Sequence, residues 1–337
     1  MPLFLDPVQT GSTGGRPSGN GLTIGLVNNM PDSACHATER QFLNLLRTAS
    51  DNVPVRVRLF AISSVPRAEQ MRRELATRYH DIDQLWDSPL DGLIVTGTEP
   101  RADKLQSEPY WQALSQLVDW ACDNTISTVW SCLAAHAAVL HIDGIVRQPL
   151  AVKLSGVFAG ESLACHQLSA GIEPRWHTPH SRLNDLPESA LRTCGYQLLS
   201  SSSTAGVDAF VKQGDQVSLF LFFQAHPEYE VDTLLREYRR DVGRFLRRER
   251  DIYPEMPRNY FNPSAALSAD AFRARAIADR RNDFASDFPT ERLMAGIEDR
   301  WRNTAICIYR NWINYLRERK QKRKRLPAVA RDRLLSA

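Results

Sequence analysis

Short apolar runs alternate with amphipathic stretches along the first half of the chain. The apolar runs have the length and composition of buried strands, and they lie at residues 22–27, 55–62, 91–97 and 126–132. Between them, residues 38–49 and 108–124 place their large apolar side chains at helical spacing. This alternation predicts an α/β fold with an open, mostly parallel sheet and helices on both faces.

The second half of the chain adds strands and then becomes helical. Residues 153–158 and 207–229 are strand-like, and a turn is expected at 213–216. Residues 231–251 and 301–316 have the periodicity of helices. Three prolines are expected to break the first of these helices, at Pro254, Pro257 and Pro263. The polar stretch 262–281 is expected to be a connection, and neither an internal repeat nor a second domain is evident.

Cys132 lies where the strand at 126–132 meets a run of small, helix-forming residues. Ligands of open α/β sheets bind outside the carboxyl ends of the strands, where Gly97 and Cys132 are both predicted to lie. Free cysteine is also among the residue types most often buried for packing alone. A thiol at such a turn can instead be a nucleophile, because the helix N-terminus stabilises a thiolate. The stretch by itself leaves both interpretations open.

Composition narrows the class of protein without giving its function. The chain has 337 residues, and its 43% hydrophobic and 24% charged residues are typical of a globular protein. It contains no apolar run long enough to cross a bilayer and no secretory signal, so we expect a cytoplasmic protein with no membrane partner. Its six cysteines form no CxxC pair, so neither a disulfide framework nor a metal site is indicated.

A basic run at residues 317–325 stands out from the modest net charge of +3. Such a run can bind nucleic acid. No aromatic residues are interleaved with these cations, so we interpret the run as a solvated tail after a helix and expect no nucleic-acid partner.

His226 and Glu228 follow the apolar run SLFLFF and are therefore predicted to lie at another strand end. Each could be an ordinary polar residue of a turn. A cysteine nucleophile, however, needs a base, and the base needs a carboxylate that fixes its tautomer. His226 and Glu228 fit these two roles beside Cys132, if the fold brings the three residues together.

The order of short motifs in this chain resembles that of the homoserine O-acyltransferases of methionine biosynthesis, in particular the homoserine O-succinyltransferase group. The shared motifs span residues 21–316 and include NMP, DGLIVTG, STVWSCLAAHAA, KLSGVF, PHSR, HPEY, RRDV and NWINYL. The resemblance implies a flavodoxin-like fold related to class I glutamine amidotransferases. The resemblance covers an acyltransferase domain at 21–316. The composition of residues 1–20 predicts a mobile N-terminal segment, and the basic run predicts a basic tail at 317–337.

The resemblance implies a ping-pong acyl transfer with an acyl-CoA as co-substrate and no bound cofactor. Cys132 matches the family's thiol, which carries the acyl group as a thioester, and His226 and Glu228 match its base and partner. Positions that contact substrate in the family are matched by Lys153, Ser181 and Arg240. An arginine can bind an α-carboxylate through two parallel hydrogen bonds, which suits Arg240 to this role.

The oxyanion hole is expected from the backbone N–H groups of Leu133 and Thr98, the latter in the turn after Gly97. Amidotransferases proper usually have G-x-C-x-G around the thiol, whereas Trp130 and Ala134 flank Cys132 here. This difference favours an acyltransferase over an amidotransferase-like hydrolase. An inactive binding homologue is the third alternative, although no member of the triad is missing.

The chain departs from the family pattern at the residue that helps to set acyl choice. Glycine at this position accompanies succinyl donors and glutamate accompanies acetyl donors, whereas this chain has Arg101. A guanidinium could bind the free carboxylate of a succinyl group, or a shifted register could leave Arg101 in solvent. We expect succinyl-CoA as donor and homoserine as acceptor, with acetyl-CoA and serine as the alternatives. Family members are often dimers, so a homodimer is among the expected assemblies.

Overall fold

A computed structural model describes residues 3–6, 21–213 and 218–325 of the chain. One large sheet runs through it, in the order β1-β3-β2-β5-β6-β11-β10-β9-β7-β8. Neighbouring strands from β1 to β11 in this order are parallel. The strands of the parallel part are β1 (Leu3–Leu5), β2 (Leu22–Val27), β3 (Val55–Ala61), β5 (Gly92–Val95), β6 (Ser127–Ser131) and β11 (Leu219–Phe223).

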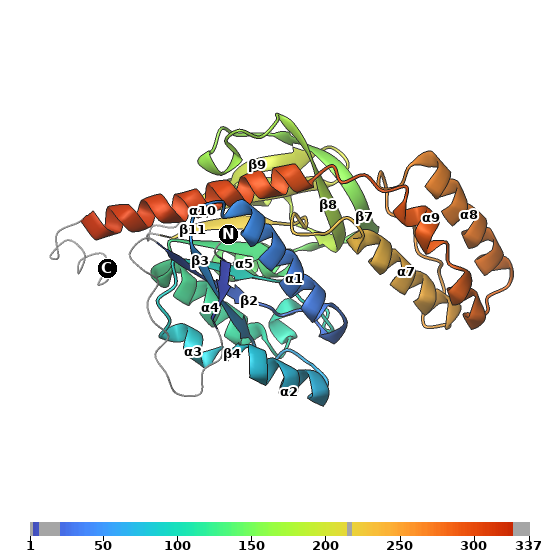
Figure 1. Ribbon diagram of the computed structural model, residues 1–337, viewed down its shortest axis with the longest axis horizontal. Helices are drawn as coiled ribbons and strands as arrows, with labels where there is room; N and C mark the ends of the chain where they lie inside the picture. The colour runs from blue at the N-terminus through green and yellow to red at the C-terminus, as the bar shows by residue number, and fades with distance from the viewer. Residues whose placement is uncertain (1–2, 7–20, 214–217, 326–337) are drawn as a thin grey trace.

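Helices cover both faces of the parallel part, as Figure 1 shows. On one face α1 (Asp32–Ala49) and α10 (Arg302–Arg325) share a core cluster with alternate residues of β2 and β3. On the other face α4 (Trp111–Asn124) and α5 (Leu133–Asp143) pack on residues of β5 and β6. Because parallel strands are buried on both faces, they are apolar almost throughout. The predicted α/β class and its mostly parallel sheet are confirmed.

The rest of the sheet is antiparallel and extends from β11. Its strands are β7 (Gln148–Ser162), β8 (Arg175–Asp185), β9 (Gln197–Ser202) and β10 (Gly206–Gln213). The strand expected at 153–158 is the middle of the long strand β7, which forms a hairpin with β8. Strands β10 and β11 pair as expected, and residues 214–217 between them lie outside the described part of the chain.

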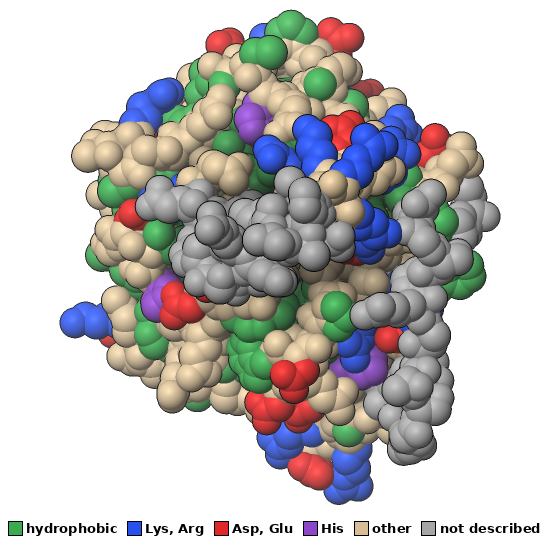
Figure 2. Space-filling model, turned by 90° about the vertical axis from the view of Figure 1, so that its left-hand side faces the viewer, with side chains coloured by type: hydrophobic (Ala, Val, Ile, Leu, Met, Phe, Trp, Pro, Cys, Tyr) green, Lys and Arg blue, Asp and Glu red, His purple; other side chains and the backbone are tan. Residues whose placement is uncertain are grey.

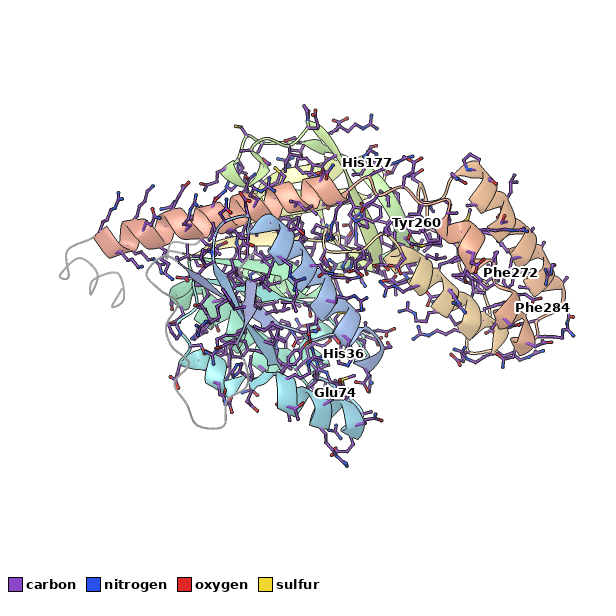
Figure 3. All side chains as sticks on the ribbon, viewed as in Figure 1. His36, Glu74, His177, Tyr260, Phe272 and Phe284 are labelled. Atoms are coloured by element: carbon purple, nitrogen blue, oxygen red, sulfur yellow. The ribbon has the colours of Figure 1, made fainter. Side chains whose placement is uncertain are left out.

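Short elements complete the described chain. They are α2 (Glu69–Arg78), β4 (His80–Asp81), α3 (Asp83–Trp86), α6 (Glu188–Thr193) and the 3₁₀ turns Leu105–Ser107, Gln167–Ser169 and Asn282–Asp287. His36 of α1 and Glu74 of α2 form an exposed ion pair of 3.0 Å and are labelled in Figure 3. None of the helices within the described ranges has both the length and the apolar character of a membrane span.

Three helices form an extension at one end of the molecule (Figure 1). They are α7 (Thr233–Leu246), α8 (Pro263–Ala278) and α9 (Thr290–Met294), which share a third core cluster. Phe272 of α8 packs edge to face on Phe288 at 5.3 Å, and Figure 3 labels it together with Phe284 in this extension. Aromatic packing therefore holds the extension together.

The expectation that residues 262–281 form a polar connection is wrong, because Pro263–Ala278 is the helix α8. Pro263 begins this helix instead of breaking one. The side chain of Asn262 accepts a hydrogen bond from the N–H of Ala265 at 2.9 Å, which is an N-cap. Proline suits the position after the cap, because an N–H there would have no partner within the helix and proline has none.

Helix α7 ends well before Pro254, so the proline is not what terminates it. Arg248 adopts a left-handed φ of +63° just after the helix. The N–H of Glu249 then donates to the carbonyl of Arg244, which satisfies a terminal carbonyl of the helix. The helix expected over 231–251 is shortened at both ends by local geometry.

The basic run at 317–325 does not follow a helix but forms the end of one, since α10 continues through it to Arg325; most of its side chains are exposed, as predicted. Lys320 is tied to the sheet: its Nζ lies 2.6 Å from the Asp91 carboxylate and donates to the carbonyl of Gly21. Figure 2 looks on to the end of the molecule where α10 stops, and Lys and Arg side chains gather on that face. Residues 326–337 lie outside the described part of the chain.

Part of the N-terminal segment expected to be mobile is also a strand. Leu3–Leu5 form β1, which pairs with β3 at the edge of the sheet. Asp6 then lies within 3.5 Å of Arg56 and Arg58 of β3. Residues 1–2 and 7–20 are outside the described ranges.

Candidate active site

Cys132 lies at a sharp turn between β6 and α5. Its backbone φ of +53° is outside the range that residues other than glycine normally adopt. The N–H of Cys132 donates to the carbonyl of Phe223 in the neighbouring strand β11, which fixes the turn. Ala134 and Ala135 are fully buried, and their small side chains allow α5 to start close to the sheet. Such a strained turn presents the side chain of a nucleophile above the sheet edge.

Gly97 and Leu133 lie side by side at the ends of β5 and β6. A Cβ built on Gly97 would be 2.9 Å from the backbone nitrogen of Leu133, so only glycine allows this approach. In the part of the chain that the structure describes, the N–H groups of Leu133 and Thr98 donate no hydrogen bond. The two groups predicted to form an oxyanion hole are therefore adjacent and free to bind an anion.

His226 and Glu228 follow β11, the strand next to β6 in the sheet. His226 Nδ1 lies 2.8 Å from Glu228 Oε1, and the His226 side chain also forms a hydrogen bond with Cys132. Both residues are almost fully buried. The structure thus brings together the three side chains predicted to act as nucleophile, base and carboxylate.

The environment of His226 favours its protonated form. Burial by itself lowers the pKa of this imidazole. The charges of Cys132 and Glu228, together with hydrogen bonds to both, outweigh burial and raise the pKa of His226 well above its usual value. A proton held on this ring stabilises negative charge on the adjacent sulfur and can later be given to a leaving group.

A buried carboxylate, Glu237 of α7, connects His226 to the polar side of the site. The ring of Tyr229 stacks on that of His226 at 4.3 Å, and its hydroxyl donates to Glu237 Oε1 at 2.6 Å. Ser181 Oγ of β8 donates to Glu237 Oε2 at 2.5 Å. Burial raises the pKa of Glu237, but Lys153 and the hydrogen bonds from Ser181 and Tyr229 lower it below its usual value overall.

Lys153, Ser181 and Arg240, the predicted substrate contacts, gather around two acidic side chains of α7. Lys153 Nζ lies 3.3 Å from Glu237 and 3.2 Å from Asp241. Arg240 donates to Asp241 Oδ1 at 3.0 Å. Burial raises the pKa of Asp241, but Lys153 and Arg240 lower it overall, so the carboxylate is charged. These groups match a zwitterionic amino acid, which needs both a cation and an anion.

A cavity of about 490 Å³ opens above the carboxyl ends of β5, β6 and β11. The predicted residues that line it are Thr98, Cys132, Leu133, Lys153, Ser181, His226, Glu228 and Arg240. In the described part of the chain, no group of three His, Cys, Asp or Glu side chains is placed to hold a metal ion. The cavity is large enough for an acyl group and an amino acid together.

Arg101 is not among the residues that line this cavity. Its side chain is exposed. The carboxylate of Glu108 accepts hydrogen bonds from the backbone N–H groups of Arg101 and Ala102, at 2.5 and 2.6 Å, and so fixes the loop. The position of Arg101 gives no support to its predicted contact with an acyl group. The alternative prediction, that its side chain lies in solvent, agrees with the structure.

Several residues that line the cavity were not found from the sequence. They are Arg147, Tyr229, Glu237, Asp241, Arg244 and Arg250. One signal was available for α7: Glu237, Arg240 and Asp241 are spaced at i, i+3 and i+4, and hence lie on one face of the helix. No comparable pattern indicates Arg147, which lies in a connection between α5 and β7.

Acid is expected to destabilise the fold through His136, a buried residue of α5. Burial, with the charges of Arg182 and Arg147, lowers its pKa to about 3. Below about pH 6.5 the unfolded chain binds a proton at this residue and the folded chain does not, so stability falls as the pH falls. At pH 5 this loss is about 2 kcal/mol.

Urea unfolding of the wild type and of His136→Gln at pH 7 and pH 5 measures this contribution. Glutamine cannot titrate but can still donate to Gln224, the residue 3.0 Å from His136 Nε2. The variant should therefore lose about 2 kcal/mol less than the wild type between the two pH values. Equal losses in both proteins would contradict the prediction.

Two comparisons of sequence agree with each other on the family. The sequence model of the homoserine O-succinyltransferase family matches residues 12–323. A homoserine O-succinyltransferase of Rhodopseudomonas palustris is 50% identical over 292 residues, which is 87% of each chain. One of Methylorubrum extorquens is 45% identical over 316 residues, or 93% of each chain. Among solved structures, a glutamine amidotransferase from Methylobacillus flagellatus is similar with a TM-score of 0.49 and 15% identity, covering 88% of this chain and 95% of its own.

Proposed function

Since the chain belongs to the homoserine O-succinyltransferase family, we propose that it transfers a succinyl group from succinyl-CoA to the hydroxyl of L-homoserine. The acyl group is carried on Cys132 as a thioester, in a ping-pong reaction. The observation that supports this most is the contact of Cys132 with the protonated, Glu228-bound His226 beside two free backbone N–H groups. The reaction places the enzyme in methionine biosynthesis, and a cytoplasmic location is part of the proposal.

In the first half-reaction the sulfur of Cys132 attacks the thioester carbonyl of the donor. A carbon–sulfur bond to Cys132 forms as the bond to the coenzyme sulfur breaks, and His226 gives its proton to the departing thiolate. The N–H groups of Leu133 and Thr98 bind the oxyanion of the tetrahedral intermediate. Glu228 keeps the imidazole in the orientation that both steps need.

In the second half-reaction the hydroxyl of the amino acid attacks the acyl-enzyme. His226, now neutral, takes the hydroxyl proton as the new carbon–oxygen bond forms, and the sulfur of Cys132 leaves. Arg240 is suited to bind the α-carboxylate of this acceptor, and Glu237 its α-ammonium group. Lys153 and Ser181 hold Glu237 in place and complete the polar side of the site.

Two other activities are distinguishable from this one. An amidotransferase-like hydrolase would release ammonia from glutamine. Such enzymes have glycines around the thiol, where this chain has the bulky Trp130 and the small Ala134. A binding homologue would form no covalent adduct. The intact triad and the open oxyanion site support an enzyme instead.

The wild-type protein is expected to turn over succinyl-CoA and homoserine faster than any other pairing of donor and acceptor. The test compares kcat/KM for succinyl-CoA and acetyl-CoA, each with homoserine and serine, and records the intact mass of the protein after each donor is added alone. Because homoserine and serine differ by one methylene, their kcat/KM values should differ by about 10- to 200-fold.

The expected adduct has the mass of one succinyl group and disappears when homoserine is added. A preference for acetyl-CoA of more than about tenfold would remove the proposed donor. Release of ammonia from glutamine without any adduct would favour the hydrolase.

A further inference from the structure

We infer that Arg147 binds the free carboxylate of the succinyl group and is the residue that makes the enzyme prefer a dicarboxylic acyl donor. This inference rests on the proposed function, which it extends from the type of reaction to the recognition of the donor. It replaces the predicted role of Arg101 with a residue that lies in the cavity.

Arg147 lies on the same cavity as Cys132, in the connection between α5 and β7. Its guanidinium is half-buried. Burial lowers the pKa of Arg147, and the charges of Tyr110, Cys132 and Glu108 raise it. The charge of Arg147 in turn lowers the pKa of His136, one helical turn after Cys132. The guanidinium is thus within electrostatic reach of the sulfur that would carry the acyl group.

Arg147 differs from the other cations that line the cavity in having no carboxylate within 4.0 Å among the described residues. The others are paired: Lys153, Arg182, Arg236, Arg240, Arg244 and Arg250. The nearby carboxylate of Glu108 accepts two backbone N–H groups of the 101–102 loop instead. Placing an unpaired charge in a half-buried position costs free energy, which an anionic ligand would recover.

The charges of the two substrates account for the arrangement of the cavity. Homoserine carries a carboxylate and an ammonium group, and the proposed function assigns them to Arg240 and Glu237 of α7, which are already paired with Asp241 and Lys153. A succinyl thioester adds one more anion, at the far end of the acyl chain. Arg147 comes from a different element and interacts with Cys132 and His136, so a cation remains for that third charge on the acyl side.

A guanidinium fits a carboxylate through two parallel hydrogen bonds, whereas an acetyl group offers it nothing to bind. Arg147 should therefore raise the rate with succinyl-CoA and leave the rate with acetyl-CoA nearly unchanged. The phosphates of coenzyme A are shared by both donors, so an arginine that bound them would affect both donors equally.

The experiment measures acyl-enzyme formation by rapid-quench intact mass with succinyl-CoA, acetyl-CoA and uncharged butyryl-CoA. Arg147→Met removes the charge, and Arg147→Lys keeps the charge but cannot form the two parallel hydrogen bonds of a guanidinium. Arg101→Met makes the charge-removing change at the exposed arginine. In Arg147→Met the second-order rate with succinyl-CoA should fall about 30- to 100-fold, while the rates with the two uncharged donors stay within about threefold. Arg147→Lys should recover part of the loss, and Arg101→Met should keep the wild-type ratio of donors.

Retained rates with the uncharged donors also show that the variant is folded. Equal losses with all three donors would overturn the inference and point to a structural role or to the phosphates of the coenzyme. A wild-type preference for succinyl-CoA that Arg147→Met leaves intact would overturn the inference alone. A wild type that forms no adduct with any donor would overturn the proposed function, and the inference with it.

Discussion

Replacing Cys132 with alanine is expected to abolish acyl transfer, with a loss in kcat/KM of about 10⁴-fold or more. Alanine should adopt the same turn, because Cys132 already has a positive φ and alanine adds no atom beyond the Cβ that cysteine has. What it removes is the only thiol that contacts His226 in the described part of the chain. Without it the donor can still bind, but no covalent bond can form.

Intact mass after addition of succinyl-CoA checks this directly. The wild type should gain one succinyl group and Cys132→Ala none, while Cys165→Ala serves as the matched control because Cys165 is exposed and outside the cavity. Calorimetry with coenzyme A, which carries no acyl group and so cannot acylate the thiol, should give similar affinities in all three proteins. An adduct that persists in Cys132→Ala would show that another residue carries the acyl group.

The parallel half of the fold could be predicted because burial on both faces leaves a simple mark in the sequence. The strands ending near Gly97, Cys132 and His226 are short apolar runs, and the structure places them side by side as β5, β6 and β11. Once these strands are parallel neighbours, their carboxyl ends must lie at one edge. The meeting of sulfur and imidazole follows from this topology more than from any single motif.

The residues proposed to bind the acceptor were harder to predict, because their role depends on contacts between distant elements. Glu237 looks like a surface charge of an amphipathic helix, and only the approach of Ser181 and Lys153 from the β7–β8 hairpin makes it part of a site. Arg147 carries even less local signal. Its proposed role rests on the lack of any carboxylate within 4.0 Å of it among the described residues, and a sequence does not record such an absence.

Local backbone chemistry explains the errors in the helical extension. Pro263 has two opposite meanings, since proline ends a helix when inside it and begins one when it follows an N-cap. Asn262 before Pro263 and two alanines soon after it favour the start of a helix. The nearby prolines at 254 and 257 instead favoured the prediction of an irregular segment. The resulting error left out α8, which carries part of the third core cluster.

Replacing Glu228 with glutamine is expected to slow acyl transfer by about 10³-fold. The substitution keeps the size of the side chain but removes the negative charge 2.8 Å from His226 Nδ1. That charge and its hydrogen bond are two of the influences that raise the pKa of His226 against the effect of burial. With glutamine, less remains to oppose the lowering of the His226 pKa by burial, so this pKa falls and the ring loses its proton at lower pH.

The sign of this shift gives the variant a signature that simple misfolding would not produce. The protonated imidazole gives its proton to the coenzyme thiolate, so acylation slows as the pH rises through the pKa of His226. In Glu228→Gln the alkaline decline of the acylation rate should therefore begin at lower pH than in the wild type, as measured by rapid quench across the pH range. Glu230→Gln is the matched control, since Glu230 does not line the cavity. It binds Arg40, Asn44 and, at 3.5 Å, Arg236, and its substitution should leave the profile unchanged. If Glu228→Gln lost activity with an unshifted profile, the carboxylate would position the ring without controlling its charge, and the electrostatic part of the mechanism would have to be given up.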